Sequence, residues 1–180
     1  MVLRKLEEDD LNIMLIWRNA PEVRQQMYSK HIISEVEHQS WYETMKLDPK
    51  SIWYIHEDQH GKPDGVVYFT NYSKDNQSSY WGFYSDPDAP KGTGSQLGIE
   101  ALDEAFKVLN LHKLNAEVLA SNLPSLGLHK KLGFSKEGVF RDFHYDGSQF
   151  IDVIRFGILS SEWANIRTTF EKALLVRKVK

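Results

Sequence analysis

The segment best suited to bind a phosphate group is a glycine-rich turn in the middle of the chain. It consists of Lys91, Gly92, Thr93, Gly94 and Ser95. A run of strand-forming aromatic residues at 80–84 precedes the turn, and an amphipathic helix pattern follows it to residue 109. Glycine lets a backbone approach a ligand closely, and the first amides of a helix lie unpaired at the positive end of its dipole. This order of elements predicts a diphosphate site, although the same turn can also be a plain helix start.

Two other phosphate-binding motifs do not fit this turn. The loop of a nucleoside triphosphatase places its lysine after the last glycine, whereas Lys91 precedes the glycines here. The dinucleotide fingerprint needs a third glycine three residues after Gly94, but Leu97 occupies that position and Gly98 comes one residue late. A nucleoside triphosphatase and a dinucleotide-binding dehydrogenase are therefore disfavoured.

A carboxylate lies within an apolar segment further along the chain. Glu117 belongs to the strand-forming run 113–119. Burial raises the pKa of a carboxyl group toward the range that suits a general base, so Glu117 is a candidate for taking a proton from a substrate. Because side chains alternate along a strand, Glu117 can also point outward as an ordinary surface residue. The sequence leaves both orientations open.

The composition limits the class of protein. The 180 residues suffice for one domain with a substantial core, and the net charge of −3 argues against a broad nucleic-acid surface. Cysteine is absent, which excludes disulfides and zinc-thiolate sites and agrees with a cytoplasmic location. Seven histidines show no paired spacing with carboxylates, so we expect no metal. No apolar run approaches the roughly 20 residues of a membrane span, and no signal-peptide core is present.

The elements that must position these residues alternate along the whole chain. Strand patterns occupy residues 2–6, 52–55, 66–70, 80–84, 113–119, 134–140 and 150–159. Helix patterns occupy the segment from Asp9 or Asp10 to Pro21, residues 22–27, 35–47, 96–109 and 124–132, and the chain after Ser160 or Ser161. A parallel crossover from the strand at 80–84 through the long helix to the strand at 113–119 is the natural connection. The pattern predicts an α/β fold.

A second motif identifies a family resemblance. Residues 122–134 contain Asn122 and Ser125 and end in Lys-Leu-Gly-Phe. Together with the glycine turn and the order of elements, this motif resembles the GNAT acetyltransferase superfamily over the chain to about Ser161. The resemblance implies a single domain over residues 1–161, with a mixed central sheet flanked by helices and a splayed parallel strand pair. Residues 162–180 would form a C-terminal helical extension. Two positions depart from the family pattern, where Ala89 replaces a usual Gln or Arg and His129 replaces a frequent tyrosine.

The first half of the chain carries a narrower resemblance. Its motifs are Trp17-Arg18-Asn19-x-Pro21, Met27-Tyr28-Ser29, Ile33-Ser34, His38 and Trp41, with the later Glu117-Val118 and Phe150-Ile151-Asp152-Val153. They are similar to the acetyltransferases of pseudaminic acid biosynthesis in bacteria, which acetylate the 4-amino group of a UDP-linked amino-dideoxy sugar used in flagellin or surface glycans. Related motifs occur in acetyltransferases of ribosomal-protein N-termini and of polyamines, so these acceptors are the alternative. A non-catalytic acyl-CoA sensor is an alternative from another class.

The GNAT resemblance implies that acetyl-CoA is the acyl donor and lies between the strands at 80–84 and 113–119. The implied contacts to it come from Phe83, Tyr84, Lys91, Gly92, Thr93, Gly94, Ser95, Asn122, Ser125 and Lys130. The glycine turn would hold the pyrophosphate, and backbone amides near Phe83 and Tyr84 would stabilise the oxyanion. Asn122 and Ser125 can instead be ordinary helix caps, and Lys130 and Lys131 can instead face solvent.

The resemblance also implies a proton donor for the leaving thiolate. In the family pattern, position 129 faces the thioester sulfur. An unperturbed histidine titrates near pH 6.5 and a thiol near 8.5, so an imidazolium at His129 can protonate the thiolate. A histidine on the helix surface is the alternative, in which case water supplies the proton.

Residues of the first half are candidates for binding the acceptor. Arg18 can pair with a diphosphate, and His38 can bond a hydroxyl or a phosphate. Met27, Tyr28, Trp41 and Tyr80 can form an aromatic slot for uracil and the sugar's apolar edge, with Glu117 orienting the amine. Core packing is the alternative for the apolar members.

Two features at the end of the chain concern assembly and the C-terminal helix. Exposed strand edges and an apolar late hairpin make a homodimer plausible. The basic helix end at Arg177, Lys178 and Lys180 is expected to be solvated and stabilised by the helix dipole.

Overall fold

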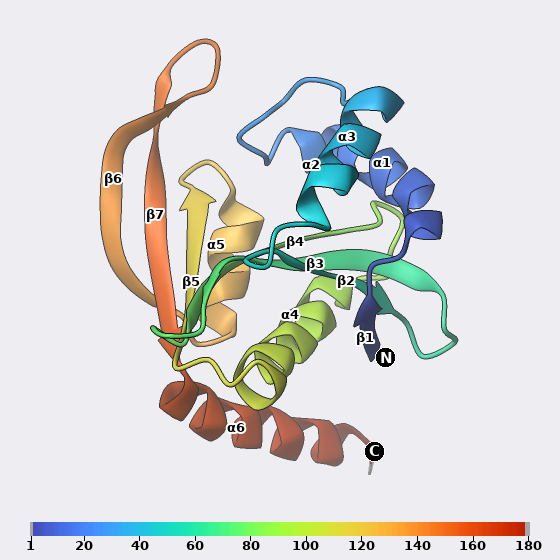
Figure 1. Cartoon of the computed structure of the whole chain (residues 1–180). Helices are drawn as coiled ribbons and strands as arrows, with labels where there is room; N and C mark the ends of the chain where they lie inside the picture. The colour runs from blue at the N-terminus through green and yellow to red at the C-terminus, as the bar shows by residue number, and fades with distance from the viewer. Residues whose placement is uncertain (1, 179–180) are drawn as a thin grey trace.

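A computed structural model describes residues 2–178, with side chains described up to Phe170. Seven strands form one sheet in the order β1-β2-β3-β4-β5-β7-β6 (Figure 1). The strands are β1 (Val2–Lys5), β2 (Ile52–Glu57), β3 (Pro63–Ser73), β4 (Ser78–Ser85), β5 (Lys113–Leu119), β6 (Ser135–Tyr145) and β7 (Phe150–Leu159). Neighbouring strands are antiparallel except β4 and β5, which run parallel.

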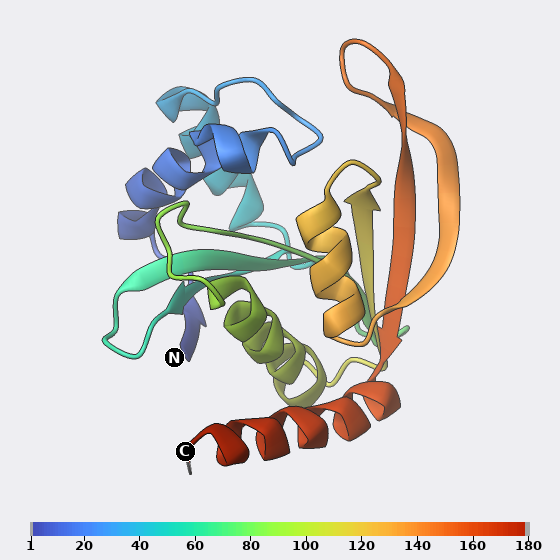
Figure 2. The same cartoon turned by 180° about the vertical axis from the view of Figure 1, so that it is seen from behind.

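Helices cover both faces of the sheet (Figures 1 and 2). They are α1 (Leu11–Asn19), α2 (Pro21–Arg24), α3 (Glu35–Met45), α4 (Thr93–Asp103), α5 (Leu123–Lys131) and α6 (Ser160–Lys178). A short 3₁₀ turn at Glu8–Asp10 precedes α1, and a π-helical segment at Glu104–Val108 extends α4. Helices α1 to α3 lie on one face, and α4 to α6 lie on the other.

Each face of the sheet has its own apolar core. The larger core joins α4 to the sheet through buried residues such as Leu97, Leu114 and Phe156, and it reaches α6 through Trp163. The smaller core packs Met14 and Trp17 of α1 against the sheet. Burial of apolar surface on both faces stabilises the position of β4, which lies in the middle of the sheet.

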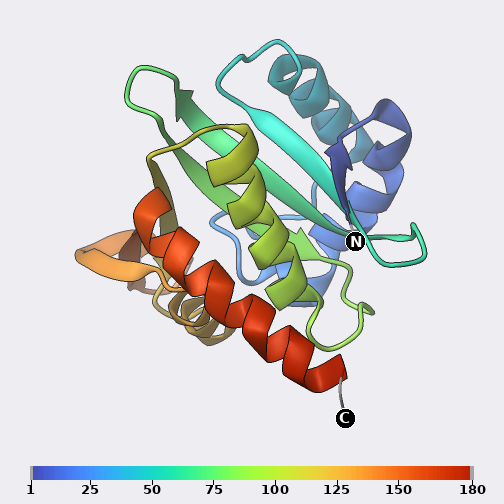
Figure 3. The same ribbon diagram turned by 90° about the horizontal axis from the view of Figure 1, so that it is seen from below.

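The first turns of α6 pack against α4 rather than trailing into solvent (Figure 3). The indole of Trp163 donates a 2.9 Å hydrogen bond to Oδ1 of Asp103 at the end of α4, and Nε of Arg167 lies 3.0 Å from Oδ2. The predicted domain boundary at residue 161 stays a prediction. The predicted basic end of the helix lies outside the described side chains.

The parallel ladder between β4 and β5 is short. It contains three residue pairs, and the last of them joins Tyr80 to Asn115. Beyond this point β4 continues against β3 to Ser85, whereas β5 continues against β7 to Leu119. The two strands therefore diverge, and the backbone edges that face the gap carry amides without a ladder partner. The splayed parallel pair implied by the resemblance is confirmed.

The predicted order of strands and helices is confirmed, and several boundaries differ. The long helix begins at Thr93 instead of residue 96, because Gly92 adopts a left-handed φ of 105° and ends the preceding turn there. Its last part is π-helical instead of α-helical. The β3 and β6 strands are longer than their apolar patterns indicated, because both extend into polar hairpin ends. No helix in the described part of the chain is long and apolar enough to cross a membrane.

The contact between α4 and the end of α5 depends on a glycine. A Cβ placed on Gly98 would lie 2.6 Å from Cδ1 of the buried Leu132. We expect Gly98→Ala to lower the free energy of unfolding, because overpacking costs about 1–3 kcal/mol and exceeds the gain in helix propensity of about 1 kcal/mol. Gly127→Ala is the matched control, since a Cβ there meets no atom within 4 Å, and we expect it to be neutral or stabilising. Urea unfolding of both variants measures this, and equal midpoints would contradict it.

Candidate active site

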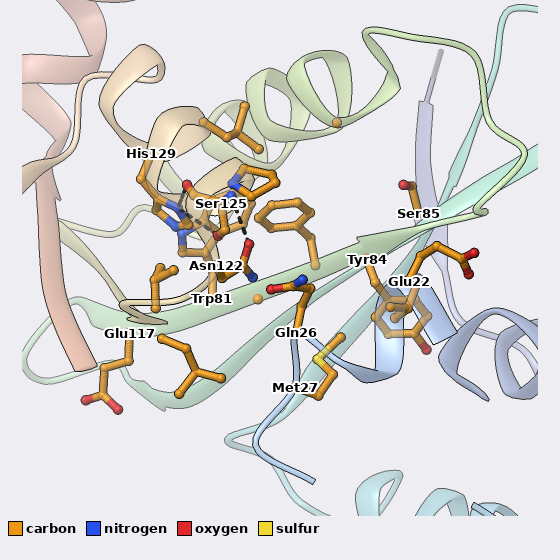
Figure 4. A pocket seen from close by; sticks show the side chains of 18 of the residues that line it. Glu22, Gln26, Met27, Trp81, Tyr84, Ser85, Glu117, Asn122, Ser125 and His129 are labelled. Carbon is orange, nitrogen blue, oxygen red and sulfur yellow. Dashed lines mark hydrogen bonds between the residues drawn. The ribbon is translucent and has the colours of Figure 1, made fainter. Parts of the chain in front are cut away.

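A cavity of about 490 Å³ lies where β4 and β5 separate (Figure 4). Its lining comes from the loop around α2, from β3, β4 and β5, from the glycine turn and from α5. The lining residues are Glu22, Val23, Gln26, Met27, Tyr28, Tyr68, Trp81, Gly82, Phe83, Tyr84, Ser85, Gly92, Gly94, Ser95, Glu117, Val118, Leu119, Asn122, Pro124, Ser125, Leu128 and His129. Most of the residues predicted to contact acetyl-CoA are therefore brought together along one groove.

The glycine turn forms one end of this groove. Gly92, Gly94 and Ser95 line the cavity, and Nζ of Lys131 donates a 2.8 Å hydrogen bond to Oγ of Ser95. The first amides of α4 thus lie beside the cavity at the positive end of the helix dipole, which suits a diphosphate. Three predicted contacts, Lys91, Thr93 and Lys130, are not among the lining residues in the described part of the chain.

Helix α5 forms the wall opposite Gln26 and Met27 (Figure 4). Oδ1 of Asn122 accepts a 3.1 Å hydrogen bond from the amide of Ser125, so Asn122 is the cap of this helix. Both residues also line the cavity, and the two interpretations are therefore compatible.

The side chain of His129 is buried among aromatic rings. Its imidazole stacks on Phe156 with a centroid distance of 5.3 Å and contacts Phe134 edge-on at 4.9 Å. Nδ1 lies 2.8 Å from the carbonyl oxygen of Ser125, which fixes Nδ1 as the protonated nitrogen and donor. Within the described part of the chain, the buried Nε2 has no hydrogen-bond partner. Its unprotonated lone pair is therefore free to accept a proton.

The ordinary pKa near 6.5 that the sequence analysis used for His129 does not apply in the folded protein. Burial lowers the pKa of His129 to about 4, and only the bond to the Ser125 carbonyl opposes this. The ordinary value assumed from the sequence ignored the rings that displace water from the imidazole. The neutral form of His129 prevails at pH 7.

Glu117 lines the same cavity, at the opposite end from Ser85 (Figure 4). Its carboxylate is paired with a cation of β7, since Nη1 of Arg155 lies 2.9 Å from Oε1 of Glu117. The hydroxyl of Tyr28 is also near, and burial together with the Glu117 carboxylate raises the pKa of Tyr28 to about 12. Glu117 is thus an oriented carboxylate in an ion pair.

A second cavity, of about 440 Å³, adjoins the first. Its lining residues are Arg18, Met27, Tyr28, Ser29, His31, Ile33, Glu37, His38, Trp41, Trp53, Tyr68 and Tyr84. Four of these, Met27, Tyr28, Tyr68 and Tyr84, also line the groove, so the two cavities meet. The second cavity can hold an acceptor whose reactive group reaches the end of the cofactor groove.

Five of the seven predicted acceptor residues line the second cavity, and Glu117 lines the first. Arg18, Met27, Tyr28, His38 and Trp41 all line the second cavity. Tyr80 lines neither cavity, so its predicted place in the slot is wrong. Its ring instead lies under the guanidinium of Arg155, with 4.3 Å between Cζ and the ring centroid.

Trp53, Tyr68 and Arg155 are site residues that the sequence analysis did not identify. Trp53 stacks on Tyr68 with a centroid distance of 4.3 Å, and together they extend the aromatic wall. Both had been assigned only to strands. Arg155 is the single basic residue of the run 150–159, and this signal in the sequence was not used.

The sequence profile of the Acetyltransferase (GNAT) domain matches residues 1–135. The chain belongs to the GNAT acetyltransferase family. Acetyltransferase PseH of Campylobacter jejuni is 30% identical over 142 residues, covering 78% of this chain and 87% of PseH. Spermidine N(1)-acetyltransferase of Vibrio cholerae is 27% identical over 180 residues, covering 92% of this chain and 96% of that protein. The crystal structure of spermidine N-acetyltransferase from Vibrio cholerae in complex with CoA and spermine superposes on this structure with a TM-score of 0.84. The two sequences are 26% identical, and the match covers 91% of this chain and 97% of that chain.

The activity of this GNAT protein follows from the family and the site together. It is an acetyl-CoA-dependent N-acetyltransferase that acts on a small-molecule amine. The groove at the strand divergence and the amides of the glycine turn fit acetyl-CoA. The described residues contain no group of three or more metal-ligating side chains.

The buried neutral His129 gives this acetyltransferase a pH-dependent stability. Unfolding returns the imidazole to water, where its pKa is near 6.5, so the unfolded chain binds more protons between pH 6.5 and 4. We expect the wild type to lose about 3 kcal/mol more stability than His129→Phe when the pH falls from 7 to 4. Urea unfolding of both proteins at each pH measures the difference. A difference that stays constant over this range would contradict the neutral, buried imidazole.

Proposed function

We propose that this enzyme acetylates the amino group of a nucleotide-linked amino sugar, specifically the 4-amino group of a UDP-linked amino-dideoxy sugar that is a precursor of flagellin or surface glycans. The observation that carries the proposal is that Arg18 lines the aromatic second cavity and that, within the described residues, its Nη1 has no hydrogen-bond partner. The similarity to PseH supports it independently.

Arg18 supports an anionic acceptor. Its Nη2 donates a 3.0 Å hydrogen bond to the carbonyl of Ser29, while Nη1 is buried and has no hydrogen-bond partner in the described part of the chain. Burial lowers the pKa of Arg18, and no carboxylate contributes to compensate its charge. A buried guanidinium is stabilised by a phosphate that accepts two parallel hydrogen bonds from it.

The aromatic wall supports a nucleobase in the same acceptor. His38 stacks on Trp41 with a centroid distance of 5.1 Å, and Trp41 contacts Trp53 edge-on at 4.7 Å. Burial lowers the pKa of His38, so its imidazole is neutral near pH 7 and can bond a hydroxyl or a base edge. A flat ring such as uracil matches the apolar surface that these side chains present.

The proton that must move during acetyl transfer suggests roles for His129 and Glu117. Acetyl-CoA supplies a thioester whose carbonyl carbon is attacked by the neutral amine, so that a C–N bond forms, a C–S bond breaks and one proton must move from nitrogen to sulfur. Nε2 of His129 accepts this proton from the amine and then donates it to the sulfur, because a neutral imidazole must gain a proton before it can give one. Backbone amides of β4 near Phe83 and Tyr84 stabilise the oxyanion, and Glu117 orients the amine.

A polyamine acceptor is the second candidate. The structural similarity to the spermidine N-acetyltransferase from Vibrio cholerae favours it. The charges of the second cavity oppose it, because Glu37 is its single carboxylate among the described lining residues. Glu37 already caps α3 and lies 3.2 Å from His31, whereas a polycation would lie against Arg18. Protein N-termini and a non-catalytic acyl-CoA sensor are weaker candidates. The predicted homodimer and cytoplasmic location stay predictions.

Arg18→Met tests the acceptor class. We expect the KM for a UDP-linked amino sugar to rise about 10–100-fold, because one charge-assisted bidentate contact is worth about 1.5–3 kcal/mol. The KM for acetyl-CoA stays within about twofold, since Arg18 does not line the cofactor groove. Steady-state kinetics with the same amino sugar lacking UDP is the control, and both proteins should use it equally. We also expect UDP to inhibit the wild type competitively against the acceptor.

Three results would contradict the sugar-nucleotide assignment. If UDP did not compete with the acceptor, the second cavity would be excluded as a nucleotide-binding site. Efficient turnover of spermidine, with no turnover of amino sugars, would establish the polyamine alternative. Binding of acetyl-CoA without release of thiol for any amine in a panel would identify the sensor.

Glu117→Gln tests the role of the carboxylate that lines the cofactor groove near Tyr28, a residue shared by the two cavities. We expect kcat to fall about 100-fold, since the amide keeps the shape of Glu117 but loses the charge that orients the amine. The affinity for acetyl-CoA, measured by calorimetry, stays unchanged. Glu43→Gln on the exposed face of α3 is the matched control. Full activity of Glu117→Gln would remove Glu117 from the reaction.

A further inference from the structure

Arg155 connects three strands at the point where the sheet divides. It lies on β7 directly across from Glu117 in the β5–β7 ladder. Its Nη1 donates a 2.9 Å hydrogen bond to Oε1 of Glu117 on β5. The same nitrogen also donates a hydrogen bond to the hydroxyl of Tyr80 on β4. The guanidinium also lies 4.3 Å above the ring of Tyr80. One cationic side chain thus holds partners on both strands that diverge.

These contacts lie at the apex of the divergence. Tyr80 belongs to the last residue pair of the β4–β5 ladder, and its pair partner is Asn115. Glu117 is two residues further along β5, so it lies on the same face of the strand as Asn115 and just beyond the last pair. The bridge through Arg155 therefore spans the place where the cofactor groove begins.

The partial burial of the pair makes its geometry well defined. Side-chain exposure is 21% for Arg155 and 27% for Glu117, so water competes less than at an open surface. The aromatic ring of Tyr80 restricts the guanidinium further through a cation–π contact. Arg155 binds Oε1 of Glu117 and the hydroxyl of Tyr28 is a second partner of this carboxylate, so an incoming amine meets a carboxylate whose direction is already fixed.

We propose that Arg155 is a positioning residue for acetyl transfer, which it promotes by holding Glu117 against the acceptor amine at the mouth of the groove. The proposal rests on the proposed function, because it requires Glu117 to contact an amine. A carboxylate that is already paired with a guanidinium is a hydrogen-bond acceptor of fixed direction. Arg155 thereby assigns Glu117 to orientation of the amine and leaves the transfer of its proton to His129.

A purely structural bridge makes different predictions from a positioning residue. A structural bridge would lower thermal stability and affect both substrates alike. A positioning residue acts through Glu117, so its loss should lower kcat/KM for the amine while acetyl-CoA binding is preserved. Its effect should also disappear once Glu117 can no longer act as a carboxylate, because the two residues then belong to one interaction.

The experiment is a double-mutant cycle with Arg155→Met and Glu117→Gln in the full chain. We expect Arg155→Met to lower kcat/KM for the amine acceptor about 100-fold, as expected for a displaced reactive group, with the Kd for acetyl-CoA within about twofold. In the Glu117→Gln background the same change should cost less than about threefold. Arg155→Lys, which keeps the charge, should recover at least about tenfold over Arg155→Met. Arg141→Met, an exposed arginine of β6, is the control and should behave as the wild type.

Each result of the cycle has one meaning. Additive losses, or equal losses in acetyl-CoA affinity and in amine turnover, would overturn the positioning role while leaving the acetyltransferase assignment intact. A wild type that turns over no amine would overturn the proposed function itself. If Arg155→Met does not fold, Tyr80→Phe and Arg155→Lys carry the test. Tyr80→Phe removes one acceptor and keeps the ring, and we expect kcat/KM to fall about threefold to tenfold; wild-type rates for both variants would overturn the positioning role.

Discussion

The short ladder between β4 and β5 is the constraint from which the site follows. Three residue pairs join the two strands, and then each strand continues in a different half of the sheet. A longer ladder would use up the facing backbone amides of β4 and close the groove with side chains. Because the ladder ends at Tyr80, the amides beyond it are available to an oxyanion, and a pantetheine-sized space opens between the strands.

Two cores, one on each face of the sheet, hold the helices that border the opening. On one face, α4 packs Leu97 and Ala101 into the larger core, which also places the glycine turn beside the groove. On the other face, α1 packs Met14 and Trp17 under the second cavity. Neither helix can move toward the gap without exposing buried apolar surface, which costs about 25 cal/mol per Å². The opening is thus maintained by packing that lies on either side of it.

Local patterns in the sequence were sufficient for the elements and for one half of the site. The glycine turn, the helix cap at Asn122 and the strand alternation are short-range features, and each appears in the structure. The remaining features depend on contacts between distant residues. Arg155 meets Glu117 only through the β5–β7 register, and the pKa of His129 depends on rings from other elements. Periodicity and spacing carry no information about such pairs, so neither the partner of Glu117 nor the lowered pKa of His129 could be predicted from the sequence.

The distribution of charge along one short segment would give the proposed acceptor a preferred direction. The carbonyl of Ser29 accepts a hydrogen bond from Arg18 in the second cavity, while the adjacent Tyr28 lies near Glu117 at the groove. A molecule that lies along this segment meets a cation at one end and a carboxylate at the other. Opposite charges gain most in such a partly dry site, and like charges are penalised by the same low dielectric. An acceptor with a phosphate at one end and an amine at the other is therefore bound with its amine toward acetyl-CoA, whereas a polycation places like charges together at Arg18.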